Sequence, residues 1–162
     1  MSNASNIELT DALAAGVFRA GLKAGVLNPG PIIAWADGRI VELAEPASWL
    51  IDLSIASPDQ VNDIVMLLRP ASEGVSAETI ANAGLALLDL PAEKSPASAR
   101  RLLSIIYPFV QHAQSPALRQ LDEMGSAFDG DPEKTAADVF AFAADRQNAA
   151  VRAFLAPVMF EV

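Results

Sequence analysis

The sequence has no cysteine and only one histidine, His112. Without cysteine the chain cannot form disulfides, a thiolate nucleophile or a cysteine-ligated metal site. A single histidine also excludes any metal site that needs two imidazoles. The glycine motifs that bind phosphates or dinucleotides, the serine-nucleophile motif and the zinc-protease helix motif do not occur. The sequence therefore predicts no cofactor and no metal ion.

Charged residues are few, at 19% of 162 residues, and acidic residues predominate. Asp and Glu number 20 against 11 Lys and Arg, which gives a formal net charge of −9. Such a chain repels phosphate backbones, so we expect no nucleic-acid partner. The interval between Glu93 and Asp122 contains no acid, and its bases are Lys94, Arg100, Arg101 and Arg119. We interpret these bases as partners of acidic groups elsewhere in the fold or on a second subunit.

Long hydrophobic runs are also missing. The uninterrupted apolar runs are only a few residues, far shorter than a membrane span. The first residues have no basic segment followed by an apolar one, the pattern of a signal peptide. We therefore expect a soluble, cytoplasmic protein with no membrane partner, and disorder in residues 1–6.

What the chain does have is apolar residues, at 52%, with many alanines and helical spacing throughout. No segment alternates with the period of a strand. The sequence predicts an all-α fold, one compact domain over residues 1–162 with seven to eight mostly antiparallel helices. The expected helices are 10–24, 31–43, 46–56, 58–69, 77–90, 96–113, 116–128 and 132–156, with a kink or split at Pro108.

The helix from Pro46 to Ala56 carries apolar side chains in nearly every direction. A helix that is apolar all round is typical of a protein interior, so we predict that this one is the buried centre of the fold. Asp52 is its one charge, and a buried carboxylate needs a partner. We expect Arg39 or Arg19 to supply it.

Two tryptophans lie close in sequence on consecutive helices, Trp35 near Arg39 and Trp49 near Asp52. They have two interpretations. The four residues either fill a core junction, or line a groove for a peptide or small apolar ligand with Arg39 as its anchor.

A second group of candidate residues lies on the helix that begins at Pro96: Arg100, Arg101, Tyr107 and His112. On helical spacing, Arg101 and His112 share a face, where a base beside a guanidinium could transfer protons. The simpler interpretation makes His112 a surface residue at a helix end, where the dipole favours its charged form.

Three kinds of function remain open, in this order. The first is a non-catalytic protein-interaction or regulatory module that binds another protein or itself as a homodimer. It accounts for the missing catalytic motifs and the mean hydropathy of +0.29. The second is a small-ligand or sensor domain with a pocket near Trp35 and Trp49. The third is an enzyme that uses Arg101 and His112. The apolar tail 154–162 either forms the interface for self-association or packs back on its own domain, and we favour the second outcome.

Overall fold

The computed structural model describes residues 6–160, which form nine α-helices and no strand. The all-α prediction is confirmed, with one helix more than the seven to eight expected. The expected disorder of residues 1–6 falls almost entirely outside this range; Asn6 alone is described, as exposed coil. The helices are α1 (Asp11–Ala24), α2 (Pro29–Glu42), α3 (Ser48–Ser54), α4 (Val61–Ala71), α5 (Ala77–Leu85), α6 (Pro96–Ala113), α7 (Leu118–Ala127), α8 (Pro132–Ala144) and α9 (Ala149–Leu155).

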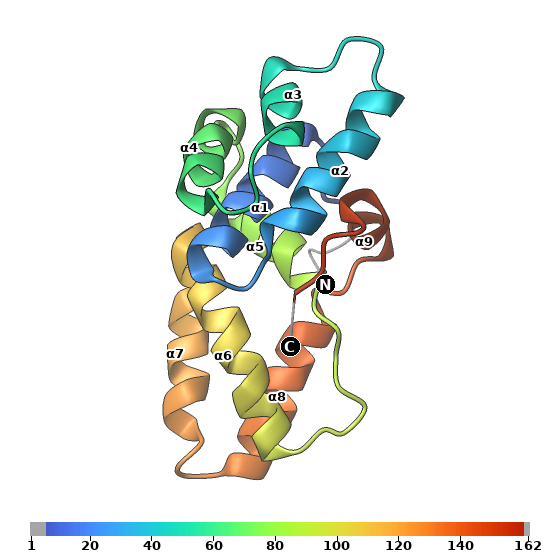
Figure 1. Ribbon diagram of the computed structural model, residues 1–162. Coiled ribbons are helices and arrows are strands. Elements are labelled where there is room, and N and C mark those ends of the chain that lie inside the picture. Colours follow the sequence, from blue (N-terminus) through green and yellow to red (C-terminus); the bar gives the residue numbers. More distant parts are fainter. Residues whose placement is uncertain (1–5, 161–162) are drawn as a thin grey trace.

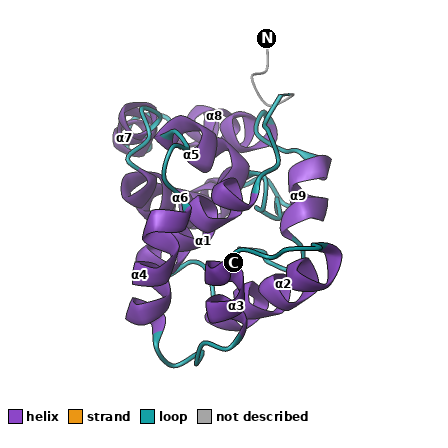
Figure 2. Ribbon diagram, turned by 90° about the horizontal axis from the view of Figure 1, so that it is seen from above, coloured by secondary structure: helices purple, strands orange, loops and turns teal. Residues whose placement is uncertain are grey.

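The helices gather into two groups that share α1 and α5 between them (Figure 1). One group contains α2, α3 and α4, and the other contains α6, α7 and α8. Seen from above, α9 lies at the side of the molecule, near α2 (Figure 2). No helix within residues 6–160 is long and apolar enough to cross a lipid bilayer.

The central helix is α1, so the prediction that the segment Pro46–Ala56 forms a buried centre is wrong. Helix α1 contacts α4, α5 and α6, and buries an almost unbroken run from Leu13 to Leu22. Its small residues let neighbours approach from several sides; a Cβ on Gly16 would lie 2.7 Å from Ile80 Cδ1. The short α3 buries only Leu50 and Leu53. Ile51 is 46% exposed and Ile55 79%, so the apolar outer face of α3 meets solvent.

Hydroxyl and carboxylate caps fix several helix starts where the sequence predicts them. The side chains of Thr10, Ser76, Ser95 and Asp131 accept the backbone N–H groups that begin α1, α5, α6 and α8. Proline at the first helical position accompanies two of these caps, at Pro96 and Pro132. Helix α6 runs through Pro108 as one element, so the expected split does not occur.

Several helix bounds differ from the prediction by two or three residues, among them the starts of α3, α4 and α7, and two ends differ by more. Helix α5 stops at Leu85, where the side-chain amide of Gln147 donates to the Leu85 carbonyl at 3.3 Å, and Leu87 and Leu88 are buried in irregular chain. The long last helix is two helices, because the Asn148 side chain accepts from the N–H groups of Ala150 and Val151 and starts α9 afresh.

The C-terminal tail, as far as residue 160, packs back on its own domain. This was one of the two outcomes expected for the tail. Val158 is 1% exposed and Phe160 4%, and the Phe160 ring lies 5.0 Å from that of Phe109 on α6. Within the described part of the tail, these apolar side chains are therefore used inside the chain.

Candidate functional site

The predicted site residues Trp35 and Arg39 are already engaged within the protein. The Trp35 indole N–H donates to the Phe154 carbonyl at 2.8 Å, and its ring packs edge-on against Phe18 and Phe154. Arg39 Nε donates to Asp11 Oδ1 at 2.6 Å and Nη1 to Glu42 at 3.1 Å. The hydrogen bond with Asp11 is the main cause that raises the pKa of Arg39. A cavity of about 240 Å³ does lie beside Trp35 and Arg39, but their polar groups are used by the fold.

Trp49 and Asp52 do not join that cavity. Trp49 is half-buried against the core from α3, and Asp52 is exposed on the same helix. The expected burial of Asp52 and its pairing with Arg39 or Arg19 are therefore wrong. Within residues 6–160, Asp52 has no ion pair, because Arg39 binds Asp11 and Glu42 instead.

The four candidates on α6 are spread along the helix. The Arg100 guanidinium stacks over Phe128 at 4.4 Å and lies 3.8 Å from Asp129, while Arg101 is exposed. His112 follows Arg101 by eleven residues, roughly 16 Å along a helix axis. The structure therefore does not bring these two residues together at one centre.

Tyr107 lies between these two residues on α6 and interacts with α7. A hydrogen bond with the Asp122 carboxylate raises the pKa of the Tyr107 phenol, because ionisation would place two negative charges side by side. The pair joins two neighbouring helices. Within residues 6–160, Asp122 is the one charged group that affects the pKa of Tyr107.

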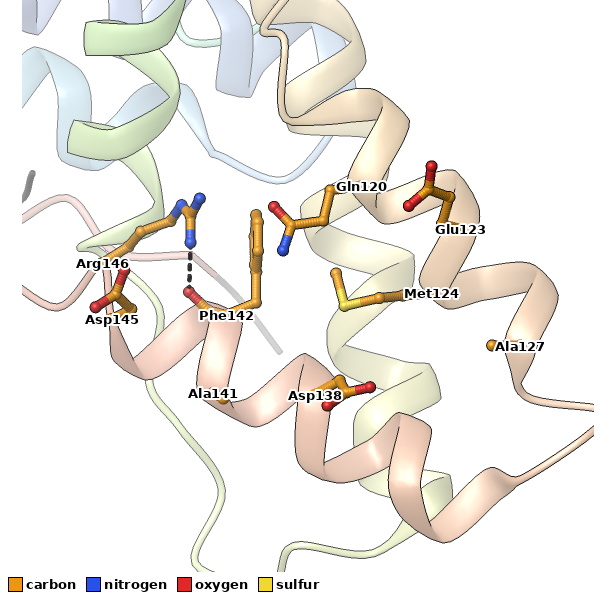
Figure 3. A pocket seen from close by; sticks show the side chains of 9 residues that line it. All are labelled: Gln120, Glu123, Met124, Ala127, Asp138, Ala141, Phe142, Asp145 and Arg146. Carbon is orange, nitrogen blue, oxygen red and sulfur yellow. Dashed lines mark hydrogen bonds between the residues drawn. The ribbon is translucent and has the colours of Figure 1, made fainter. Parts of the chain in front are cut away.

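A larger concave surface lies elsewhere, between α7 and α8. These helices form an antiparallel hairpin whose turn ends at Asp131, the cap of α8, which accepts from Lys134 N at 3.1 Å. Both helices pack on α6, and between them they leave a groove of about 770 Å³. The groove is thus a consequence of how two amphipathic helices rest on a third (Figure 3).

The floor of this groove is apolar and its rim is acidic. Met124 and Phe142 form the floor and are 8% and 4% exposed, and the exposed Ala127 and Ala141 line the groove beside them. Phe142 and Met124 point into the groove from opposite helices (Figure 3). The remaining lining residues are polar or charged: Gln120, Glu123, Asp138, Asp145 and Arg146.

Arg146 closes one end of the groove. Its guanidinium stacks on the Phe142 ring at 3.6 Å, and Nη1 donates to the Phe142 carbonyl at 2.9 Å (Figure 3). Burial lowers the pKa of Arg146, against the opposing charges of Asp145 and Glu78. Its Nε is buried without a hydrogen-bond partner among the described residues. The cation is therefore fixed on the aromatic ring rather than extended into solvent.

The sequence prediction missed this groove entirely. The residues that line the groove follow the usual pattern of buried and exposed positions in two amphipathic helices. Nothing in their spacing indicates a gap between the helices. One signal was available: Asp138, Ala141 and Asp145 share one helix face at spacings of three and four, as an acidic stripe around a small residue.

Comparison with known proteins finds no matching family model, no matching curated protein and no matching solved structure. Among residues 6–160, no group of three or more histidines, aspartates or glutamates is placed to hold a metal ion. The site is therefore defined by its geometry, as a groove on an all-α domain.

Proposed function

We propose that the protein is a non-catalytic interaction module whose α7–α8 groove binds a basic amphipathic helix of a partner protein. The observation that carries the proposal is the combination of an apolar floor with a rim of carboxylates. We also propose that the protein acts in the cytoplasm, as expected from its sequence.

The shape of the groove favours a helix as its occupant. Two antiparallel helices with a gap between them can receive a third helix, whose apolar face rests on Met124 and Phe142. Helix α7 has ten residues, about 15 Å of axis. A partner segment of roughly three turns would span it, with apolar anchors spaced three and four residues apart.

The charge of the rim favours a basic partner. Glu123, Asp138 and Asp145 contribute three carboxylates, and Arg146 contributes one cation that is stacked on Phe142. Glu123 has a weak exposed pairing with Arg119 at 3.5 Å, whereas Asp138 and Asp145 have no ion pair within residues 6–160. The whole chain is also acidic, which speeds encounters with a cationic partner.

The two other expected functions have less support. The ligand pocket near Trp35 and Trp49 would need polar groups that the fold already uses. An enzyme based on Arg101 and His112 would need the two residues to converge, and they lie on α6 eleven residues apart. Self-association remains a prediction, though the tail offers little apolar surface for it.

The direct test uses fluorescence anisotropy with a labelled peptide designed as a helix of leucine anchors and lysines. We expect saturable binding that weakens when the lysines are replaced by glutamates. The informative variant is Ala141→Arg, which places a bulky cation in the groove and lowers its negative charge without removing any core side chain, since Ala141 is exposed.

The matched control is Ala92→Arg, an exposed loop residue outside the groove. Both variants change the net charge equally, so general attraction of a polycation to an acidic protein affects them alike. The proposal predicts that only Ala141→Arg abolishes binding. Equal affinity for both variants would refute it, as would a scrambled peptide that binds as tightly as the amphipathic one.

A further inference from the structure

A small basic cavity lies along α1. It is about 140 Å³ in volume and is formed where α1 meets the ends of α4 and α6 and the side of α5. Arg19 and Lys23 come from α1, and His112 from the last turn of α6. The remaining lining is neutral: Gly16, Ala20, Ser72, Ile80, Ala113 and Gln114.

The charge of this cavity is opposite to that of the molecule. The chain has nearly twice as many acids as bases, yet no carboxylate lines this cavity, and three of its side chains can carry positive charge. Most other arginines have an anionic or aromatic partner; Arg39, Arg100, Arg119 and Arg152 pair with carboxylates. Arg19 and Lys23 have no ion pair or side-chain hydrogen bond with any residue in the range 6–160.

Helix ends do not account for these bases. Cations often bind the free carbonyls at helix C-termini. Here those carbonyls are bonded by backbone N–H groups of the chain that follows: Gly21 and Leu22 accept from residues 25–27, and Val110 and Gln111 from Gln114 and Ser115. Arg19 lies further inside α1, and its Nε is shielded from solvent without a partner in the described chain. A desolvated donor of this kind needs a partner, which in an open cavity can be a bound water, ion or ligand.

We propose that this cavity binds a phosphate group, either free phosphate or the phosphate of a small phosphomonoester. A phosphate monoester carries about two negative charges at neutral pH, which matches the permanent cations Arg19 and Lys23. Its oxygens accept charge-assisted hydrogen bonds from guanidinium, ammonium and imidazole donors. The volume suits one oxyanion rather than a nucleotide. This inference is independent of the α7–α8 groove.

The single histidine makes the site easy to observe. The imidazole signals of His112 in a proton–carbon correlation spectrum come from one residue and need no further assignment. We expect these signals to shift saturably with inorganic phosphate at fixed pH and ionic strength, and not with chloride. Glycerol 3-phosphate is the second probe and represents the phosphomonoesters. The probe with the lower dissociation constant identifies which of the two ligands the cavity prefers. Saturation by either probe supports the site.

Lys23→Glu tests the role of the cavity, since Lys23 is exposed and its replacement leaves the core intact. The matched control is Lys94→Glu, an exposed loop residue outside the cavity with the same charge change. We expect Lys23→Glu to weaken phosphate binding roughly tenfold or more, the order of one lost charged hydrogen bond, and Lys94→Glu to leave it nearly unchanged. Circular dichroism verifies that both variants fold.

Three results would overturn the inference. His112 signals that do not saturate with either probe show that there is no site. An equal response to chloride shows an ionic-strength effect. An equal loss of affinity in Lys94→Glu and Lys23→Glu shows that the net charge of the protein, and not the cavity, controls the response.

Discussion

Arg39 connects its own helix α2 to two parts of the chain that are distant in sequence, α1 and α9. It binds Asp11 at the start of α1, Glu42 at the end of α2, and its guanidinium lies 5.5 Å above the Phe154 ring of α9. The Arg39 and Asp11 side chains are 23% and 26% exposed. This pair is thus better shielded from water than an ordinary surface ion pair. Its contribution to the free energy of unfolding should lie between that of an exposed ion pair and that of a buried one.

The first prediction compares the two aspartates that could have paired with Arg39. Asp11→Ala should lower the free energy of unfolding by roughly 1–3 kcal/mol, because it leaves a half-buried guanidinium without its shortest ion pair. Asp52→Ala should change it by less than about 0.5 kcal/mol, as at a surface site. Urea denaturation measures both. A larger cost at Asp52 than at Asp11 would contradict the assignment.

The choice of Asp11 could not be predicted from the sequence. The sequence named Arg39 as one of two partners for Asp52 and left Trp35 either in a core junction or in a groove. The structure buries Trp35 and pairs Arg39 with Asp11. The prediction placed Asp52 inside because Trp49, Leu50, Ile51 and Leu53 surround it along the chain. The neighbours of a short helix in space decide which of its faces is buried. The number of apolar residues in the helix does not give that information.

Helices α5 and α6 cross closely at Gly84. This glycine is buried near the end of α5, and a Cβ there would overlap the Phe109 ring of α6. Phe109 itself is fully buried and also packs on Phe160, so it has little room to move. The missing side chain at Gly84 therefore sets the distance between the two helices.

The second prediction uses a pair of glycines in helices. Gly84→Ala should destabilise the protein by roughly 1–3 kcal/mol through overpacking, despite the better helix propensity of alanine. Gly38→Ala is the control, since a Cβ there meets nothing within 4 Å in the middle of α2. It should stabilise by up to about 1 kcal/mol. Thermal or urea unfolding distinguishes them, and a stabilising Gly84→Ala would show that α5 and α6 are not in close contact.

Element boundaries were predictable where a local cap defines them. Thr10, Ser76, Ser95 and Asp131 are read directly from the sequence because the cap bonds a residue two or three positions ahead. The end of α5 was not predictable in this way, since the Leu85 carbonyl is bonded by Gln147, 62 residues away. Asn148 is a local cap that the prediction overlooked among helix-forming alanines.

At the scale of the molecule, the all-α class followed from helical periodicity and the lack of strand alternation, but the arrangement of the helices did not. The central position of α1 depends on small residues that let α4, α5 and α6 approach together. The α7–α8 groove depends on how far apart two helices sit on α6. Both features depend on the distances between helices, and an amphipathic sequence pattern does not determine those distances.

The last prediction concerns the tail, for which the sequence left an interface and an intramolecular clasp open. Phe160 is 4% exposed and packs on Phe109, so Phe160→Ala should lower the free energy of unfolding by roughly 3–5 kcal/mol. The control is Ile55→Ala, which removes apolar surface from a side chain that is 79% exposed and should change stability little.

Analytical ultracentrifugation of the same Phe160→Ala protein separates the two roles of the tail. A clasp within one chain predicts that the sedimentation coefficient stays constant while the melting temperature falls. A dimer that dissociates into a monomer of unchanged stability would instead identify the tail as the interface between two copies. The first outcome is expected, because Val158 and Phe160 are already covered by their own domain.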